Sequence, residues 1–305
     1  MSSQNHIAVR IVSPAGHIAP EIIEAGAKTL RTWGWEVSLG KYAFGKYGRY
    51  AGTPEQRAAD LHDALRSPEI DVIWCARGGY GCMQLLDLLS IEEIANAQKC
   101  LIGYSDITVL HALWQKAGVS SVHGPMMKHL GEQPQHPSTL MLKAWIEQHK
   151  NDRHIASPRL EIPSHPLNIP GKVTGELIGG NLAVLSALHA TPYDFNYDGK
   201  ILFIEDIAES PYKIDRMMQT LKYSGILQKI SGLLIGQFTD CSEDSEMQGS
   251  IYENIRSIVA PFGKPVAFNV PIGHVVDNYP MGEGMRYRIE VQYDDNETKT
   301  IIDTI

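Results

Sequence analysis

The sequence predicts an α/β protein with an N-terminal Rossmann-like or flavodoxin-like parallel-sheet domain and a second, more β-rich α/β domain. Short β-rich segments alternate with longer helical patterns from residue 7 to about residue 145, as in βαβ units. Four prolines among polar residues then disfavour helix and central strand between residues 151 and 172. We therefore expect an N-terminal domain over 1–150, a proline-rich linker over 151–172 and a C-terminal domain over 173–305.

In the first half, β-rich segments are expected at 6–12, 36–38, 71–76 and 100–104. Helical patterns cover 19–33, 55–66 and 107–117. In the last of these, Val109, Leu110, Leu113 and Trp114 have helical spacing and Gly118 provides the stop. A short apolar segment, 119–123, follows.

In the second half, strands are expected at 172–179, 201–204, 231–238, 266–270, 287–291 and 298–302, with a short helix at 182–189. A second helix is expected over 211–223, where apolar residues recur at i, i+3, i+4 and i+7. Pro211 suits its first turn and Gly225 its end. Strands thus outnumber helices in this half.

Composition excludes several classes of protein. The 305 residues are 43% hydrophobic and 20% charged, which favours a folded chain over a disordered one. Lys and Arg number 27 against 35 Asp and Glu, and the resulting charge of −8 disfavours a nucleic-acid or anionic-membrane partner. Neither a signal peptide nor a membrane-spanning apolar run is recognisable, so we expect a cytoplasmic protein. The four cysteines form no C-x-x-C pair and the 12 histidines no H-E-x-x-H motif, so no metal or other cofactor is expected.

A serine stands where an apolar strand meets a helical pattern. Gly103 precedes Ser105 by two residues and relieves crowding at a sharp turn, which is typical of a nucleophile elbow. The usual motif also has glycine two residues after the serine, where this chain has Ile107. The alternative is that Ser105 only caps the helix over 107–117.

A glycine-rich turn, Arg77-Gly78-Gly79-Tyr80-Gly81, follows the expected strand at 71–76. Bare backbone N–H groups in such a turn suit an oxyanion or a carboxylate. The dinucleotide and P-loop fingerprints both fail here. A tight βα turn that requires positive φ is the alternative interpretation.

Two adjacent acids end the strand at 201–204, and a histidine follows the strand at 266–270. Glu205 or Asp206 would orient His274, which would take a proton from Ser105 in an acyl-transfer triad. Such a triad would place the site between the two domains. Taken singly, each acid could instead cap a helix, and the histidine could simply be solvated.

Eight short motifs in register give the chain a resemblance to a known family. They are Ser13-Pro14-Ala15-Gly16, Ala51-Gly52-Thr53, Arg77-Gly78-Gly79-Tyr80-Gly81, Gly103-Tyr104-Ser105-Asp106, His123-Gly124-Pro125-Met126, Gly179-Gly180-Asn181-Leu182, Glu205-Asp206 and Gly273-His274. Together they span nearly the whole chain, which resembles the LD-carboxypeptidases, the serine peptidase family that includes the microcin C self-immunity proteins.

The resemblance implies a Ser-His-Glu triad of Ser105, His274 and Glu205, with oxyanion-hole N–H groups from Asp106 and Gly79. It makes Arg77 a candidate for recognising the substrate carboxylate, an alternative being that Arg77 pins the turn through a buried ion pair. His123 and Asn181 are candidate pocket residues by their places in the motifs. The implied fold has a barrel-like C-terminal domain.

The implied activity is hydrolysis of the L–D bond to the terminal D-alanine of murein tetrapeptides, or of their sugar- or nucleotide-linked forms. In this family it serves cytoplasmic peptidoglycan (cell-wall) recycling, without a metal, in a homodimer. One alternative is a microcin-immunity-like hydrolase of aminoacyl-nucleotide amides, whose members tend to carry an added loop that we do not see here. The other is a non-catalytic ligand-binding protein.

Overall fold

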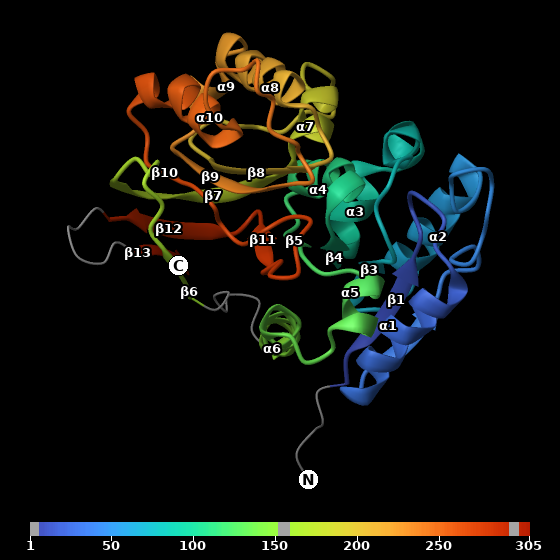
Figure 1. Cartoon of the computed structure of the whole chain (residues 1–305). Helices are drawn as coiled ribbons and strands as arrows, with labels where there is room; N and C mark the ends of the chain where they lie inside the picture. Colours follow the sequence, from blue (N-terminus) through green and yellow to red (C-terminus); the bar gives the residue numbers. More distant parts are fainter. Residues whose placement is uncertain (1–5, 152–158, 293–298) are drawn as a thin grey trace. The chain divides into compact units, whose positions relative to one another are not determined.

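A computed structural model of the protein describes residues 6–151, 159–292 and 299–305. It divides into two compact units, each with its own sheet (Figure 1). The first contains the described residues of Met1–Ile155 together with Val276–Gly282, and the second those of Ala156–Val275 and Glu283–Ile305. The predicted α/β class, with a parallel N-terminal sheet and a second, β-rich part, is confirmed.

The sheet of the first unit has the order β11-β5-β4-β3-β1-β2. Its strands are β1 (Ala8–Val12), β2 (Glu36–Leu39), β3 (Val72–Cys75), β4 (Cys100–Gly103), β5 (Ser121–His123) and β11 (Met281–Glu283). Strands β1 to β5 pair in parallel in the order 2-1-3-4-5, which is flavodoxin-like. Ligands of such folds bind outside the carboxyl ends of the strands, at the point between β1 and β3 where the strand order reverses.

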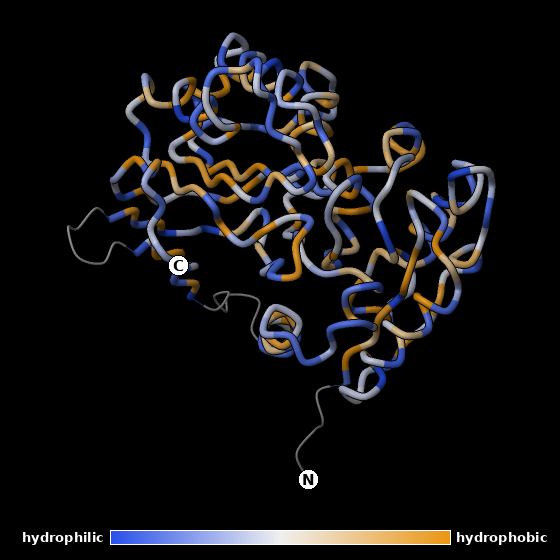
Figure 2. Tube along the Cα trace, viewed as in Figure 1, coloured by the Kyte–Doolittle hydropathy of each residue, from blue (hydrophilic) through white to orange (hydrophobic). Residues whose placement is uncertain are grey.

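Two helical layers flank this sheet. The helices are α1 (Pro20–Thr32), α2 (Pro54–Arg66), α3 (Ile91–Ala97), α4 (Thr108–Lys116), α5 (Met127–Glu132) and α6 (Pro137–Asn151), with 3-10 turns η1 (Cys82–Leu88) and η2 (Ser105–Ile107). Helix α1 packs against α5, whereas α3 packs against both α2 and α4. Apolar strands form the centre of each sheet and appear orange in Figure 2.

The second unit is built on a seven-stranded mixed sheet, β10-β9-β8-β7-β12-β13-β6. Its strands are β6 (Leu160–Pro163), β7 (Gly171–Asn181), β8 (Ile201–Ile207), β9 (Gly232–Thr239), β10 (Val266–Ala267), β12 (Arg286–Val291) and β13 (Lys299–Thr304). The four neighbouring strands β7, β8, β9 and β10 pair in parallel. On the other side of β7, the strands β12, β13 and β6 pair antiparallel. An isolated bridge from Ile169 to Val266 joins the chain after β6 to β10 at the opposite edge, so the sheet curls toward a barrel.

Helices cover the parallel half of this second sheet. They are α7 (Leu182–Leu188), α8 (Pro211–Tyr223), α9 (Ile226–Lys229) and α10 (Ile251–Val259), followed by the 3-10 turn η3 (Ala260–Phe262). Figure 1 shows α7, α8 and α10 over β7, β8 and β9. Helix α8 has the predicted bounds, with Pro211 in its first turn and Gly225 after its end.

Two features differ from the sequence prediction. Strand β6 lies inside the segment expected to be a linker; it is an edge strand, where proline is tolerated. Residues 152–158 of that segment lie outside the described residues. The second difference is that residues 276–282, expected in the C-terminal domain, belong to the first unit.

Candidate active site

Ser105 occupies a strained backbone position at the carboxyl end of β4. Its φ is +67°, a left-handed conformation that side chains other than glycine rarely adopt. Such strain is found where the surrounding structure imposes it, and a nucleophile elbow is one such place. The conformation of Ser105 is therefore that of an elbow serine.

Close packing explains why the elbow needs glycine before the serine and tolerates isoleucine after it. A Cβ on Gly103 would lie 2.9 and 3.0 Å from side-chain carbons of Ile107 and 3.1 Å from Cys75 Cβ. The Ile107 side chain thus fills the space that Gly103 leaves open. Behind the turn, buried His111 contacts the Gly103 carbonyl through Nε2 at 3.0 Å and the Ser121 hydroxyl through Nδ1 at 2.7 Å. Burial lowers the pKa of His111 to about 4, so the ring is neutral and supports the elbow as a structural group.

The alternative that Ser105 caps the following helix is wrong. The N-cap of α4 is Ile107, and that of η2 is Tyr104; neither makes a side-chain capping hydrogen bond. Ser105 lies within η2, so its hydroxyl is not used to begin either helix.

The glycine-rich turn packs directly on this serine. A Cβ built on Gly78 would lie 2.8 Å from Ser105 Cβ and 3.0 Å from its Oγ. Gly79 and Gly81 have φ of +107° and +136°. The turn therefore does require glycine for its positive φ, as a tight βα turn would. The same turn lies beside the candidate nucleophile, so it remains suited to bind an oxyanion or a carboxylate as well.

A buried arginine and the aspartate after Ser105 hold the turn in place. Arg57, 1% exposed, donates to the carbonyls of Pro14 at 2.6 Å and Gly81 at 2.9 Å. The Asp106 carboxylate accepts from the N–H of Cys82 at 2.8 Å. Burial raises the pKa of Asp106, while the Arg57 charge acts in the opposite direction. Arg57 thus binds the carbonyl, and Asp106 the N–H, of the peptide between Gly81 and Cys82. Because Asp106 directly follows Ser105, this contact ties the turn to the serine.

The other candidates of the first unit make different contacts. Arg77 is exposed and donates to the His17 carbonyl at 2.9 Å, so the alternative of a buried ion pair does not describe it. Its guanidinium remains accessible to an anion. His123 is fully buried at the end of β5, with its ring centre 5.6 Å from that of Tyr104.

In the second unit, Glu205 and His274 form a pair. Glu205 Oε2 lies 2.7 Å from His274 Nδ1, the carboxylate is fully buried, and the His274 side chain is 15% exposed. The register between β8 and β9 shifts after Ile204, so Glu205 lies opposite an extra residue of β9 while it stays in register with Asn181 of β7. Gly273 lets the loop approach, since a Cβ there would lie 2.7 Å from Glu205 Oε2.

Asp206, the acid next to Glu205, makes its contacts at the start of α7 instead. Its carboxylate accepts from Asn181 Nδ2 at 2.8 Å and from the N–H groups of Ala183 and Ile207, each at 2.9 Å. Asn181 in turn caps α7 by accepting from the Val184 N–H at 3.2 Å. Burial raises the pKa of Asp206 to about 6. Of the two adjacent acids, Glu205 therefore contacts the histidine, while Asp206 and Asn181 fix the start of α7.

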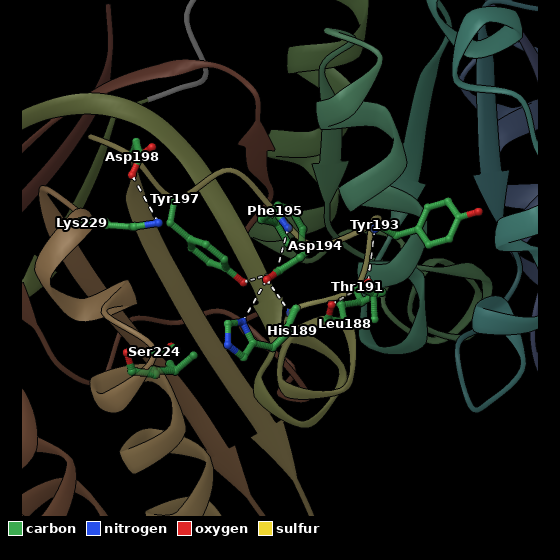
Figure 3. Close-up of polar contacts among 12 residues, drawn as sticks. Leu188, His189, Thr191, Tyr193, Asp194, Phe195, Tyr197, Asp198, Ser224 and Lys229 are labelled. Atoms are coloured by element: carbon green, nitrogen blue, oxygen red, sulfur yellow. Dashed lines mark hydrogen bonds and ion pairs between the residues drawn. The ribbon is translucent and has the colours of Figure 1, made fainter.

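A second histidine–carboxylate pair in this unit shows what distinguishes the first. In Figure 3, Asp194 lies at the centre of a cluster, accepting from His189 Nδ1 at 2.9 Å and the Tyr197 hydroxyl at 3.0 Å. It also accepts from the N–H groups of Ala190 and Phe195, and so ties together the loop after α7. This carboxylate is committed to the loop's own backbone, which is a structural role.

From Val276, two residues after His274, the chain belongs to the first unit. There Asp277 pairs with His136 Nε2 at 3.2 Å, and His136 Nδ1 contacts the Ser138 hydroxyl at 2.9 Å. Asn278 and Met281 are each 2% exposed. The segment that follows His274 is therefore fixed by packing and by the contact between Asp277 and His136.

Two features of the candidate site were not predicted from the sequence: the buried Arg57 beneath the turn, and the close packing of Gly78 on Ser105. A signal for Arg57 was present: it shares the buried face of α2 with Leu61 and Ala64, at i, i+4 and i+7. An arginine in such a row must find polar partners in the core. Gly78 carried no separate signal, because its contact with Ser105 joins two loops far apart in sequence.

The described residues contain neither a candidate metal-binding cluster nor a helix that could span a membrane. No group of three or more His, Cys, Asp or Glu side chains in that part of the chain is arranged to hold a metal ion. Among the same residues, none of the helices has the length and apolar character needed to cross a bilayer.

A strained serine at the end of a strand and a buried glutamate–histidine pair are chemical groups that serine hydrolases use. The family comparison is specific. Residues 9–124 match the LD-carboxypeptidase N-terminal domain and residues 174–289 the LD-carboxypeptidase C-terminal domain. The chain belongs to the LD-carboxypeptidase family.

Individual proteins agree with this placement. The chain is 34% identical to the murein tetrapeptide carboxypeptidase of Pseudomonas aeruginosa, over 92% of this chain and 94% of the relative. The crystal structure of muramoyltetrapeptide carboxypeptidase from Oxalobacter formigenes matches with a TM-score of 0.84 at 27% identity, covering 97% of this chain and 98% of the other. The microcin C7 self-immunity protein MccF, in complex with aspartyl sulfamoyl adenosine, matches with a TM-score of 0.81 at 22% identity, over 97% and 95% of the two chains. At that identity the last match shows a shared fold.

Proposed function

We propose that this protein is a serine carboxypeptidase that removes the terminal D-alanine from murein tetrapeptides by cleaving an L–D peptide bond. The observation that carries the proposal is Ser105, held at φ +67° at the end of β4 and packed against a glycine-rich turn. The substrate class follows from the murein tetrapeptide carboxypeptidase that is 34% identical over most of both chains.

In the proposed mechanism Ser105, His274 and Glu205 act together. Because Glu205 accepts from Nδ1 of His274, Nε2 is the nitrogen that takes the Ser105 proton. The Ser105 oxygen attacks the carbonyl carbon of the L–D bond. The resulting oxyanion is stabilised by the N–H groups of Asp106 and Gly79. The rigid packing of the turn on the serine favours this, since such donors act best when pre-organised.

The second half of the reaction reverses these proton transfers. His274 gives its proton to the amine of the departing D-alanine, which leaves an ester between the peptide and Ser105. A water molecule, deprotonated by His274, then hydrolyses the ester and restores the serine. The steps draw on side chains and backbone N–H groups of this chain, so we propose no metal or cofactor.

Binding must select a peptide with a free terminal carboxylate. We assign this carboxylate to the glycine-rich turn and the accessible guanidinium of Arg77, which is not committed to a buried ion pair. His123, buried beside Tyr104, and Asn181 are retained as candidate pocket residues, the latter through its hold on α7. We further propose a homodimer that acts in the cytoplasm on murein fragments, free or linked to a sugar or nucleotide.

The test is mass spectrometry of products. Purified protein is incubated, with no metal added, with a murein tetrapeptide and separately with an aminoacyl sulfamoyl nucleoside, and Ser105→Ala is run in parallel. We expect loss of one D-alanine from the tetrapeptide with the wild type and none with the variant. Cleavage of the nucleoside alone would replace the assignment with a microcin-immunity-like hydrolase, and no cleavage of either would leave a binding protein.

A further inference from the structure

Two of the eight sequence motifs, Ser13-Pro14-Ala15-Gly16 and Ala51-Gly52-Thr53, take no part in the proposed chemistry. They lie in the loops after β1 and β2, whereas the glycine-rich turn follows β3. Because β1, β2 and β3 are parallel, their carboxyl ends meet at one edge of the sheet, where the strand order also reverses. The contacts of the two motifs connect them to the turn and, through the turn, to Ser105.

One buried guanidinium joins both motifs to the turn. Arg57 Nη1 donates to the carbonyls of Pro14 at 2.6 Å and Gly81 at 2.9 Å. Its Nε donates to the Gly52 carbonyl at 3.1 Å. Arg57 is 1% exposed, so its donors need acceptors within the protein, and three different loops provide them. Arg57 therefore fixes the positions of these three loops relative to one another.

The loop after β1 makes a second contact with the turn. The Gly16 N–H donates to the Gly78 carbonyl at 3.1 Å. The peptide between Gly78 and Gly79 is trans, and in a trans peptide the N–H points opposite to the C=O. Since the Gly78 carbonyl is directed at Gly16, the Gly79 N–H is directed away from it. Gly16 thus sets the direction of one of the two N–H groups that we assign to the oxyanion hole.

Gly16 is itself held by contacts on its own loop. Pro14, two residues earlier, is bound through its carbonyl by Arg57. The Ala15 carbonyl accepts from the Ala51 N–H at 3.1 Å, which joins the two motifs directly. The Gly16 N–H cannot turn without disturbing these bonds. The loop after β1 is therefore a fixed support for the turn.

Close packing transmits the position of this support to the turn. A Cβ on Gly16 would lie 3.1 Å from the Gly78 carbonyl oxygen, and a Cβ on Gly79 would lie 3.5 Å from Gly16 Cα. At the other end of the turn, a Cβ on Gly81 would lie 2.8 Å from Arg57 Nη1. A displacement of the loop or of the guanidinium therefore moves the peptide that carries the Gly79 N–H.

We propose that Arg57 is a positioning residue of the reaction, which aligns the Gly79 N–H for the oxyanion by holding the turn and the loop after β1. This inference rests on the proposed function, which assigns that N–H to the oxyanion hole. A donor of this kind lowers the barrier when it is aligned before the negative charge develops. Arg57 acts through the carbonyls of Pro14 and Gly81, not through contact with the substrate.

The experiment measures kcat and KM for D-alanine release from a murein tetrapeptide by the wild type, Arg57→Met, Arg57→Lys and Gly16→Ala. The matched controls are Arg66→Met and Arg66→Lys. Arg66 is the last residue of the same helix, α2, and its exposed side chain pairs with Glu93. Urea unfolding shows whether each variant is folded.

We expect graded losses of kcat. Arg57→Met removes the donors of the guanidinium and should lower kcat about 100-fold, as for a misplacement of roughly 1 Å. Arg57→Lys keeps a cation with three donors and should lose less. Gly16→Ala should lose roughly 3- to 10-fold, because its methyl group must move the Gly78 carbonyl by a few tenths of an ångström. In each variant kcat should fall by a larger factor than KM rises, since the oxyanion exists only in the transition state. The Arg66 variants should match the wild type.

Several outcomes would overturn the positioning role. Wild-type kcat in folded Arg57→Met does so, and so does a rise in KM with kcat unchanged, because Arg57 would then serve binding alone. An equal loss of kcat in the Arg66 variants would assign the effect to α2 as a whole. If Arg57→Met does not fold, Gly16→Ala decides, since it keeps the guanidinium and displaces only the support of the turn; an unchanged kcat there overturns the proposal. Absence of D-alanine release by the wild type is a different failure, which overturns the proposed function itself.

Discussion

Replacing Gly78 by alanine tests how closely the glycine-rich turn is fitted to the candidate nucleophile. The new methyl carbon would lie 2.8 Å from Ser105 Cβ, 3.0 Å from its Oγ and 3.1 Å from the Tyr104 carbonyl oxygen. Carbon atoms in contact prefer about 3.5–4.0 Å, so the turn and the elbow must separate by roughly 0.7–1.2 Å. Neither side moves freely, because the Arg57 and Asp106 bonds hold the turn and packing against Ile107 holds the elbow.

The size of the effect follows from that displacement. Overpacking of this kind costs about 1–3 kcal/mol of folding free energy. A misplacement of about 1 Å between reacting groups costs about 100-fold in rate. For Gly78→Ala we therefore expect kcat for D-alanine release to fall roughly 100-fold while the protein still folds, with a lower denaturation midpoint.

Gly124→Ala is the matched control for stability. A Cβ at Gly124 would meet its nearest atoms at 3.5 Å, an ordinary contact, so its denaturation midpoint should match that of the wild type. The assay is a comparison of kcat and of urea unfolding for wild type and both variants. Wild-type kcat and stability in Gly78→Ala would refute the close fit of turn and serine.

Three further predictions concern Gly273, Ser105 and Asp206 of the candidate site. Gly273→Ala should lower kcat about 100-fold. Its φ is +113°, and a methyl group there would lie 2.7 Å from Glu205 Oε2, so the carboxylate that contacts His274 would be displaced. An unchanged kcat would contradict a catalytic role for this pair. Ser105→Gly should be more stable to urea than Ser105→Ala by roughly 1 kcal/mol, since glycine relieves the left-handed strain at φ +67°, and equal midpoints would count against that strain. Burial raises the pKa of Asp206 from 3.8 to about 6, so the folded state holds this proton more tightly and stability should fall as pH rises from about 4 to 6. The fall amounts to about 3 kcal/mol, and in Asp206→Asn it should disappear from urea unfolding curves; an equal slope in the variant argues against the buried, protonated carboxyl.

Much of the fold was predictable because its strongest signals are local. The 13-residue helix α8 has the predicted bounds, since apolar periodicity, Pro211 and Gly225 all indicate the same limits. Alternation of strands and helices gave the parallel sheet of the first unit. Helix α10 was missed although a capping box of Ser250 and Glu253 marks its start.

Features that depend on distant contacts were not predictable. The return of residues 276–282 to the first unit depends on the pairing of β11 with β5 and of Asp277 with His136, which no local pattern announces. The edge strand β6 is stabilised by β13, more than 130 residues later in the chain. Its prolines alone indicated a linker.

For the candidate site, the sequence located the chemical groups but could not assign their contacts. The motif alone left elbow and helix cap both open for Ser105, and the backbone conformation decides between them. The residue pattern alone did not distinguish Glu205 from Asp206 as the partner of His274. Adjacent residues of a strand point to opposite faces of the sheet, so Glu205 contacts His274 while Asp206 contacts the start of α7. Which face meets the histidine depends on a loop 69 residues later in the chain.

The central claim is that Ser105, His274 and Glu205 act as one unit, and a mutant cycle on D-alanine release tests it most directly. The measurement compares kcat for Ser105→Ala, His274→Ala and Glu205→Gln, singly and combined, with urea unfolding confirming that each variant is folded. We predict that the triple variant is no slower than Ser105→Ala alone, because a serine without its base, or a base without its serine, cannot complete the reaction. Losses that multiply from one variant to the next would contradict a shared mechanism and separate the serine from the glutamate–histidine pair.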